Sequence, residues 1–256
     1  MSAWWISIIV VALAIAAAVG GMLIVRRVVG LPFLERHNEV AGSIYSVLGV
    51  LYGALLAFTV VTAWERRAQA DEYVSAEANS LADLYRDAEA FPGPVRDSIR
   101  SHILEYARIV IEEEWPAMAR GEESDAAWGA LHRIWAGYLG FEPAEGYQRA
   151  WYDESIDRLN DLDDYRRLRL LRARAPIPGL LWTVLLVLAV VTTAFSFLFG
   201  ARDVRAQAIM TAALAGVLVL SLFIIRALEK PFAPPAGIEP DAFSEVFRPF
   251  DRWAGE

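Results

Sequence analysis

Residues 40–64 read VAGSIYSVLGVLYGALLAFTVVTAW, and this charge-free stretch decides the fold. An α-helix rises about 1.5 Å per residue, so about twenty apolar residues cross the hydrocarbon core of a bilayer. The stretch has 25 residues and is therefore long enough to span a membrane with some tilt. We predict a membrane-spanning helix here.

One face of this predicted helix carries small side chains. Positions three or four apart lie on the same side of a helix. The small residues that share this face are Gly42, Ser46, Gly49, Gly53 and Ala57. Gly49 and Gly53 have the GxxxG spacing that lets a second helix backbone approach closely. We expect this face to pack against another helix.

The neighbouring face carries hydroxyl groups. Tyr45, Tyr52 and Thr59 recur every seven residues, and Leu56 lies between them. A hydroxyl at membrane depth is costly unless it meets a partner or water. Two interpretations stay open: a buried helix whose hydroxyls bond to neighbouring helices, or a helix that lines a water-filled path. In the second case the lining residues would be Tyr45, Gly49, Tyr52, Leu56 and Thr59.

Three more apolar runs predict further membrane spans: residues 4–25 and 178–200, which carry no charge, and residues 206–226, whose only charged residue is Arg226 at the end. No Lys or Arg precedes the first run, which is also longer than the core of a signal peptide, so we expect a retained helix. The predicted layout places two spans in residues 1–64, a soluble domain in 65–175, two spans in 176–226 and a tail rich in Pro and Phe in 227–256. The predicted fold class is an all-α polytopic membrane protein, with four transmembrane helices and a helical cytoplasmic domain inserted between the second and the third.

Residues 26–39 are expected to form a short connector between the first two spans, because Gly30 and Pro32 break helices. His37, Asn38 and Glu39 then adjoin the second span and are candidates for a pore mouth. His37 and Glu39 could hold a metal ion or a proton, but two ligands do not make a site. The simpler interpretation is a polar cap, with Asn38 as the N-cap and Glu39 in the first turn.

Apolar residues between positions 65 and 175 recur at helical spacing, and no alternating strand pattern occurs. The second span is expected to continue into the first apolar stripe and to end before the Pro-Gly-Pro sequence at 92–94. Ser124 or Asp125 should cap a later helix. The stretch predicts a bundle of about four helices. We expect the tail to pack against the protein as an extended segment.

Acidic charge is concentrated in the soluble domain. The chain has a formal net charge of −8, and residues 65–179 alone hold 15 basic and 23 acidic residues. An acidic surface repels nucleic acid and raises the local concentration of cations, so no nucleic-acid partner is expected. Glu112, Glu113 and Glu114 are consecutive and would point in different directions on a helix, so we expect one to face inward beside Trp115 and the others to face water.

Nothing in the sequence indicates an enzyme, a metal site or a cofactor. The chain has no cysteine, which excludes disulfides and thiolate ligands. It contains no GxGxxG, P-loop, HExxH or GxSxG motif. Its histidines other than His37 are His102 and His132, which lie on amphipathic stretches where surface or packing roles are expected.

Basic residues beside the spans predict the orientation, because loops rich in Lys and Arg stay in the cytoplasm. The nine on the side of the soluble domain are Arg66, Arg67, Arg166, Arg167, Arg169, Arg172, Arg174, Arg226 and Lys230. The five on the other side are Arg26, Arg27, Arg36, Arg202 and Arg205. We therefore expect a multi-pass protein of the inner membrane, with the soluble domain and both termini in the cytoplasm.

Several strings in a fixed order carry a resemblance to a known family. They are HNEVAG at 37–42, GVLYGALLAF at 49–58, EANSLADLYRDA at 77–88, EEWPAM at 113–118, PGLLW at 178–182 and LEKPFAPPAGIEPDAF at 228–243. Together they resemble the bacterial membrane-protein family called bestrophin-like, or DUF4239, over nearly the whole chain. Bestrophins are pentameric ion channels with four membrane spans and a helical cytosolic domain, and their second membrane helix lines the pore. The Ile-Pro and phenylalanine pattern of the bestrophin neck is not found in residues 40–64.

Two functions follow as hypotheses. The first is a homo-oligomeric ion channel, a pentamer by analogy, in which residues 40–64 line the pore and Leu56 forms an apolar constriction. The lipid bilayer and inorganic ions would be its partners, and the acidic domain would favour cations. The second is a non-conducting membrane scaffold or sensor that docks a cytoplasmic partner through exposed aromatic residues such as Trp128 and Trp135.

Overall fold

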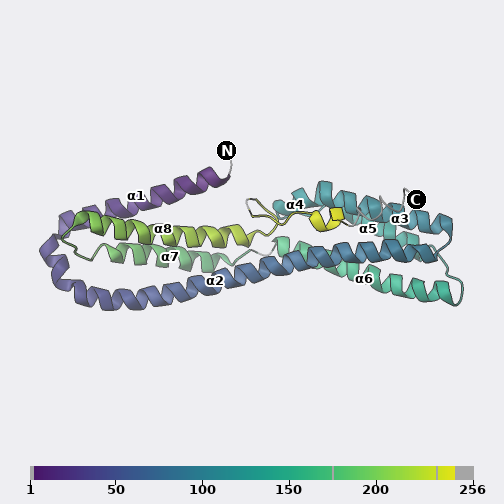
Figure 1. The fold of residues 1–256 in the computed structure, drawn as a ribbon, viewed down its shortest axis with the longest axis horizontal. Coiled ribbons are helices and arrows are strands. Elements are labelled where there is room, and N and C mark those ends of the chain that lie inside the picture. The colour runs from purple at the N-terminus through teal and green to yellow at the C-terminus, as the bar shows by residue number, and fades with distance from the viewer. Residues whose placement is uncertain (1–2, 175, 235, 246–256) are drawn as a thin grey trace. The chain divides into compact units, whose positions relative to one another are not determined.

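The computed structural model describes residues 3–174, 176–234 and 236–245. Its elements are α1 (Ala3–Val29), α2 (Leu31–Asp87), the 3-10 helix η1 (Ala88–Ala90), α3 (Gly93–Ile109), the π-helix η2 (Val110–Glu114), α4 (Trp115–Ala119), α5 (Asp125–Leu139), α6 (Tyr147–Arg174), α7 (Gly179–Ser196) and α8 (Val204–Glu229) (Figure 1). The described residues contain no strand, which confirms the all-α prediction.

The chain divides into two compact units. Unit 1 consists of Met1–Glu65 and Pro176–Glu229, and unit 2 consists of Arg66–Ala175 and Lys230–Glu256. Helix α2 contributes its first part to unit 1 and its second part to unit 2. Unit 2 is therefore built from two segments of the chain that are separated in sequence by α7 and α8.

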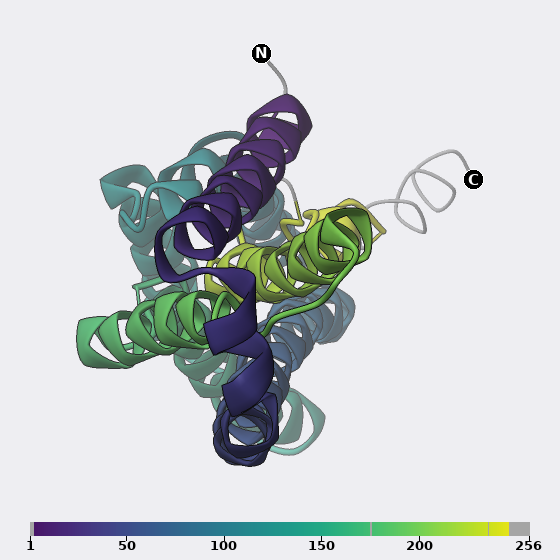
Figure 2. The same cartoon turned by 90° about the vertical axis from the view of Figure 1, so that its left-hand side faces the viewer.

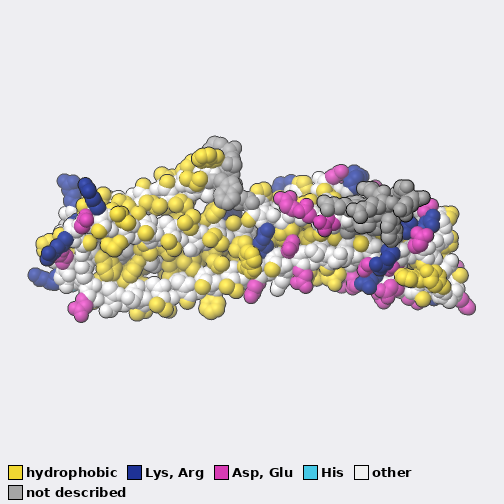
Figure 3. Space-filling model, in the orientation of Figure 1, with side chains coloured by type: hydrophobic (Ala, Val, Ile, Leu, Met, Phe, Trp, Pro, Cys, Tyr) yellow, Lys and Arg dark blue, Asp and Glu magenta, His cyan; other side chains and the backbone are white. Residues whose placement is uncertain are grey.

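Unit 1 holds the apolar helices. Four helical stretches, which include α1, α2, α7 and α8, are long and apolar enough to cross a membrane. Figure 2 looks along these helices and shows α1 lying against α8, its main neighbour in the unit. On the visible face of these helices hydrophobic side chains predominate, and basic residues gather at the end where α1 turns into α2 (Figure 3). This pattern is typical of helices surrounded by lipid.

The turn between α1 and α2 differs from the predicted connector. Only Gly30 lies outside the two helices, and its φ of 86° is one that residues with a side chain rarely adopt. Pro32 is the second residue of α2, where its missing N–H costs little. The predicted short connector over 26–39 is therefore reduced to one residue: the break at Gly30 is confirmed, and the break at Pro32 is wrong because Pro32 belongs to the start of a helix.

Asn38 is consequently not an N-cap, because it lies in the second turn of α2. Glu39 follows it in the helix and is exposed. The side chain of His37 is also exposed, and its Nδ1 lies 2.8 Å from the carbonyl oxygen of Phe33 one turn earlier. The polar cap predicted from the sequence is therefore wrong. His37, Asn38 and Glu39 all lie inside α2 and do not cap its start.

Unit 2 has a single apolar core. The predicted stripes supply it, with Leu81 on α2, Ile103 on α3, Ile134 on α5 and Leu162 on α6 all buried in one cluster. Ser124 is the N-cap of α5, and its hydroxyl accepts a hydrogen bond from the backbone N–H of Ala127. This confirms one of the two caps considered from the sequence.

The C-terminal segment completes the same core. Phe232, Ile238 and Phe243 are buried in the cluster, and the indole nitrogen of Trp115 donates a hydrogen bond to the carbonyl oxygen of Ile238 (2.9 Å). The segment packs against the protein as predicted, although residues 241–245 are helical rather than extended. The rest of the predicted tail, residues 246–256, lies outside the described residues.

Candidate functional site

The part of α2 in unit 1 has an inner face that packs against other helices of the same chain. Tyr52, Leu56, Thr59 and Ala63 are all buried, and Tyr52 is 2% exposed. Tyr52, Leu56 and Ala63 belong to an apolar cluster with Leu185 of α7 and with Leu218 and Ile225 of α8. Positions 52, 56, 59 and 63 follow the three- and four-residue steps of one helix face. The other helices of unit 1 therefore hold α2 by this face.

The hydroxyl groups on this face find few partners. Thr59 donates to the carbonyl oxygen of Leu55 in its own helix (2.7 Å). The Tyr52 hydroxyl is buried without a hydrogen-bond partner among the described residues. The ring of Tyr45 is half-buried and packs against Phe195 and Phe199, with ring centroids 6.0 and 5.3 Å apart. The face is thus a packing surface within the chain, with one buried hydroxyl that lacks a hydrogen-bond partner among the described residues.

A second face of α2 carries the small residues. A methyl group added at Gly49 or Gly53 would meet no atom of the described residues within 4 Å, and one at Gly42 would only touch Phe199 at 3.9 Å. Ser46 and Ala57 are exposed beside them. No described helix of the chain packs closely on this face.

A third face carries larger apolar side chains that are also exposed. Val50 is 72% exposed and Phe58 is 74% exposed, and Val47, Leu51 and Val61 are exposed as well. Their spacing places them opposite the inner face. Sequence reasoning missed this face because it concentrated on the glycines and hydroxyls. The signal was present in the recurrence of large apolar residues at 47, 50, 54, 58 and 61, with only Ala54 small.

The five candidate lining residues do not share one exposed face. Gly49 is exposed, Tyr45 is half-buried, and the remaining three, Tyr52, Leu56 and Thr59, are buried within the subunit. Their role in lining a path stays a prediction. The same holds for the packing role of Gly42, Ser46, Gly53 and Ala57, whose face is free in the subunit.

Polar contacts tie the helices of unit 1 together at one end. The amide of Asn38 makes two hydrogen bonds with the backbone of Gly200, donating to its oxygen (2.8 Å) and accepting from its N–H (2.9 Å). Arg26 donates to the backbone of Ala201 (2.5 Å) and to the side chain of Gln207 (2.6 Å). Asn38 therefore joins α2 to the turn before α8, while His37 and Glu39 point elsewhere. Among the described residues no group of three His, Asp or Glu side chains lies close enough to hold a metal ion.

A buried carboxylate, that of Glu229, also joins two helices of unit 1, at the end of α8. Glu229 accepts hydrogen bonds from the backbone N–H of Ile177 and the indole N–H of Trp182, both at 3.1 Å, and pairs with Arg226 at 2.7 Å. It thereby joins the end of α8 to the start of α7. Sequence reasoning did not single out this residue, although an acidic residue directly after an apolar run was visible.

Unit 2 contains a fully buried cluster of charges. Arg169 bridges Glu77 (2.6 Å) and Glu114 (2.7 Å), and Arg166 pairs with Glu114 (2.5 Å). The hydroxyl of Tyr106 donates to Glu77 (2.7 Å). Glu114 ends the π-helix η2, and its burial beside Trp115 while Glu112 and Glu113 face outward confirms the prediction that one of the three turns inward.

Electrostatics inside the cluster favours the charged forms of Glu114 and Arg169. Burial alone would raise the pKa of Glu114, but the guanidinium groups of Arg169 and Arg166 outweigh it and hold that pKa below its ordinary value. Burial would lower the pKa of Arg169, but Glu77 and Glu114 raise it above its ordinary range. Burial and the nearby charge of Glu77 raise the pKa of Tyr106 well above its ordinary value. The cluster therefore holds two paired acids and two paired bases.

The burial of Arg166 and Arg169 corrects the count of basic residues from which the orientation was predicted. Arg166 and Arg169 were counted among the basic residues that flank the membrane, whereas both are enclosed in the core of unit 2. Without them, seven basic residues stand against five on the other side. The predicted orientation keeps its direction with a smaller margin.

Comparison with known proteins gives a consistent result. A family model described as a bestrophin-like domain matches residues 12–243. The fold is similar to crystal structures of a bacterial bestrophin homolog from Klebsiella pneumoniae. One of these, a point mutant, gives a TM-score of 0.74 at 13% identity over 96% of this chain and 99% of that chain. The one solved by Zn-SAD phasing gives 0.73 at 13% identity over 96% and 98%. No curated protein matches the sequence.

Proposed function

The chain belongs to the bestrophin-like family, and from that premise we propose that it is a homo-oligomeric ion channel of the inner membrane whose pore is lined by α2. The family resemblance implies a pentamer, and inorganic ions and the lipid bilayer would be its partners. The narrower DUF4239 label remains a prediction. The proposal needs no cofactor and no nucleic acid.

The observation that carries the proposal is the unpacked surface of α2. One face is held by α7 and α8, while the small-residue face and the large apolar face are both free in the subunit. A face of glycine, serine and alanine offers little to lipid but permits close approach of another helix. We place a second copy of the chain against it. Side-by-side copies of α2 would then surround an axis.

The large apolar face would form the narrow part of the pore. With the inner face fixed and the small-residue face covered by a neighbour, the exposed large apolar face remains to face the axis, with Val50, Ala54 and Phe58 along it. An apolar ring of this kind gates by excluding water. Gly49 is the one predicted lining residue that is already exposed. Tyr45, Tyr52, Leu56 and Thr59 would support the lining from behind, and they would reach the axis only if α2 rotated.

Ion preference and orientation belong to the same proposal. The net charge of −8 is carried by residues 65–179, so a vestibule formed by copies of unit 2 would concentrate cations. We place unit 2 and both termini in the cytoplasm on the balance of basic residues. His37, Asn38 and Glu39 would then lie at the opposite mouth.

The decisive experiment is an ion-flux assay on the purified protein in liposomes. We expect potassium flux above that of empty vesicles, and a several-fold rise for Phe58→Ser, because a hydroxyl favours hydration of the apolar ring. The control is Ile209→Ser, which alters a side chain of similar exposure (70%) on α8. Absence of flux for all common cations and anions, or equal flux in Phe58→Ser and the wild type, would contradict the proposal.

The scaffold alternative loses the surface on which it relied. Trp128 and Trp135 are half-buried and pack against the core of unit 2. Arg166 stacks over the ring of Trp128, with its guanidinium carbon 4.2 Å from the ring centroid. Oligomeric state separates the two functions. A ring with a central opening supports the channel, and a monomer supports the scaffold.

A further inference from the structure

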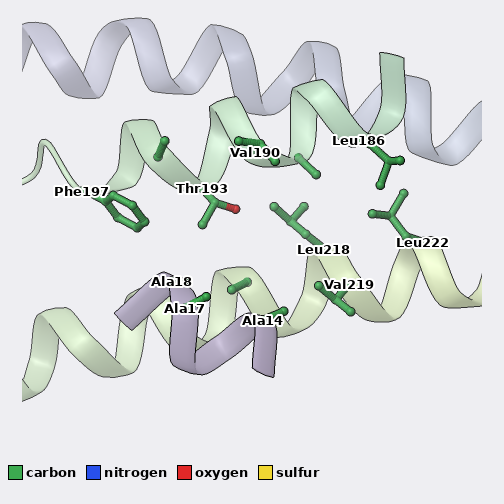
Figure 4. Close-up of a pocket in the computed structure, with 13 residues that line it drawn as sticks. Ala14, Ala17, Ala18, Leu186, Val190, Thr193, Phe197, Leu218, Val219 and Leu222 are labelled. Carbon is green, nitrogen blue, oxygen red and sulfur yellow. The ribbon is translucent and has the colours of Figure 1, made fainter. Parts of the chain in front are cut away.

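A cavity of about 350 Å³ lies between α1, α7 and α8 in unit 1 (Figure 4). Ala14, Ala17 and Ala18 of α1 line one side of it, and Val190 of α7, Phe197 just after α7, and Leu218 of α8 line the others. The alanines account for the space, because α1 presents methyl groups where larger side chains would fill the gap between three helices.

The chemistry of the lining excludes a polar occupant. Every lining side chain is apolar except that of Thr193, which carries one hydroxyl group. A buried water needs two to four polar partners, and an enclosed apolar cavity of about 150 Å³ stays dry and binds hydrocarbon. An ion or a polar metabolite would lose its hydration without compensation. Whatever occupies the cavity is therefore a hydrocarbon.

The dimensions favour a single chain over a helix. The lining on α7 and its C-cap runs from Leu186 to Phe197, which at the rise of an α-helix is about 16 Å. A helix about 10 Å wide and of that length would need more than roughly 1,000 Å³, about three times the space present. By contrast, a cavity of about 150 Å³ accommodates benzene, so this one has room for roughly a dozen carbon atoms.

The position of the cavity indicates where a hydrocarbon chain would come from. Leu186 and Val190 line the cavity and are 50% and 68% exposed, so the cavity opens on the outer surface of unit 1. The three helices around it are long and apolar enough to span a membrane, and the solvent at that depth is the acyl chains of lipids. We propose that this cavity binds one acyl chain of a membrane phospholipid. The proposal does not depend on whether the protein conducts ions.

The test compares two phenylalanine variants on adjacent positions of α1. Both Ala16 and Ala17 are exposed, but only Ala17 lines the cavity. Ala17→Phe fills the space, and Ala16→Phe adds the same ring to the outer surface. Each protein is reconstituted with a phospholipid that carries a photoreactive diazirine in the middle of one acyl chain. After photolysis the adducts are mapped by mass spectrometry, and lipid retained in mild detergent is counted by native mass spectrometry.

We expect one retained phospholipid per subunit, with adducts concentrated on residues 14–18 and 186–197. Ala17→Phe should lower both readouts at least five-fold, and Ala16→Phe should leave them unchanged. Equal thermal midpoints for the two variants would verify that both fold. Adducts spread evenly over the exposed helices, equal labelling of the two variants, or cross-links from this cavity to a second copy of the chain would overturn the proposal.

Discussion

Unit 1 and unit 2 place their polar side chains in opposite positions. In unit 1 the interior around Tyr52, Leu185 and Leu218 is apolar, and the bonds of Asn38 and Glu229 lie at the ends of helices. In unit 2 four charged side chains occupy the centre of the fold. A helix surrounded by lipid can reach water only at its ends, so polar groups gather there. A bundle surrounded by water can bury charges, provided that they are paired.

Removing one base from the centre of unit 2 should have the largest effect. Arg169→Met would leave Glu77 with only the hydroxyl of Tyr106 and Glu114 with only Arg166, in a site with no exposure. Breaking a buried pair in this way costs about 3–5 kcal/mol. We expect the thermal midpoint in detergent, followed by circular dichroism, to fall by roughly 6–20 °C. Arg167→Met is the matched control, because Arg167 is exposed on the same helix and should change the midpoint by less than about 2 °C.

If both arginine variants melt at the same temperature, the ion pairs are not what holds the centre of unit 2, and the contrast between the units fails. A triple variant tests whether unpaired charge, rather than lost packing, causes the loss of stability. Replacing Glu114 together with Arg166 and Arg169 by apolar residues of similar volume should recover part of the loss, because fewer charges are then left unpaired.

The turn before α8 should give the next largest effect, this time in unit 1. A methyl group added at Gly200 would lie 2.7 Å from the backbone nitrogen of Glu35 and 2.9 Å from the Cβ of Leu34. Gly200→Ala should therefore push the turn away from α2, weaken the bonds to Asn38 and cost about 1–3 kcal/mol. The thermal midpoint of the purified protein measures this. Gly179→Ala serves as control, since an added methyl group meets nothing within 4 Å there. A neutral Gly200→Ala would show that the ends of unit 1 are loosely held.

Acid should weaken unit 2 through Glu114. Because its pKa is lower in the folded protein than in the unfolded chain, it contributes stability above the unfolded value of about 4.3, and this contribution is lost as the pH falls through the folded pKa. Each unit of difference in pKa corresponds to about 1.4 kcal/mol. We expect melting curves at pH 7, 4 and 3 to show a smaller decline for Glu114→Gln than for the wild type. Glu113→Gln, an exposed neighbour, should follow the wild type, and parallel curves for all three proteins would exclude Glu114 as the group responsible.

The smallest expected effect concerns the attachment of the C-terminal segment. Trp115→Phe keeps an aromatic ring against Phe232 and Phe243 but removes the hydrogen bond to Ile238. The cost should be about 1 kcal/mol. Because the segment then detaches more often, the rate of protease cleavage between residues 230 and 245 should rise relative to the wild type. Trp135→Phe is the control, and equal cleavage of both variants would mean that apolar packing alone fixes the segment.

The sequence predicted the positions of the helices better than the contacts that their side chains make. Runs without charge located the apolar helices, and helical spacing identified the stripes of unit 2, because burial follows the periodicity of a helix. Ser124 and Glu114 were placed correctly for the same local reasons. Pro32 was misinterpreted because proline both breaks helices and begins them, and only the φ of Gly30 distinguishes the two cases here.

The partners of long side chains could not be predicted. Arg166 and Arg169 sit in a run of five arginines that resembles a membrane border, and their acids lie 52 to 92 residues away. Likewise, glycines and tyrosines on neighbouring faces of α2 indicated that this helix is special, but not which face its own subunit covers. That choice depends on the packing of α7 and α8, which local periodicity does not contain.

The divided make-up of unit 2 has a consequence for biosynthesis. Phe232, Ile238 and Phe243 leave the ribosome only after both α7 and α8, yet all three are buried in a core whose other members are made before α7 begins. Until they arrive, that core has an open apolar side, and such surfaces attract chaperones and proteases. The core of unit 2 can therefore be completed only after α7 and α8 have been translated. A nascent chain arrested before Phe232 keeps the apolar side of this core exposed to chaperones and proteases.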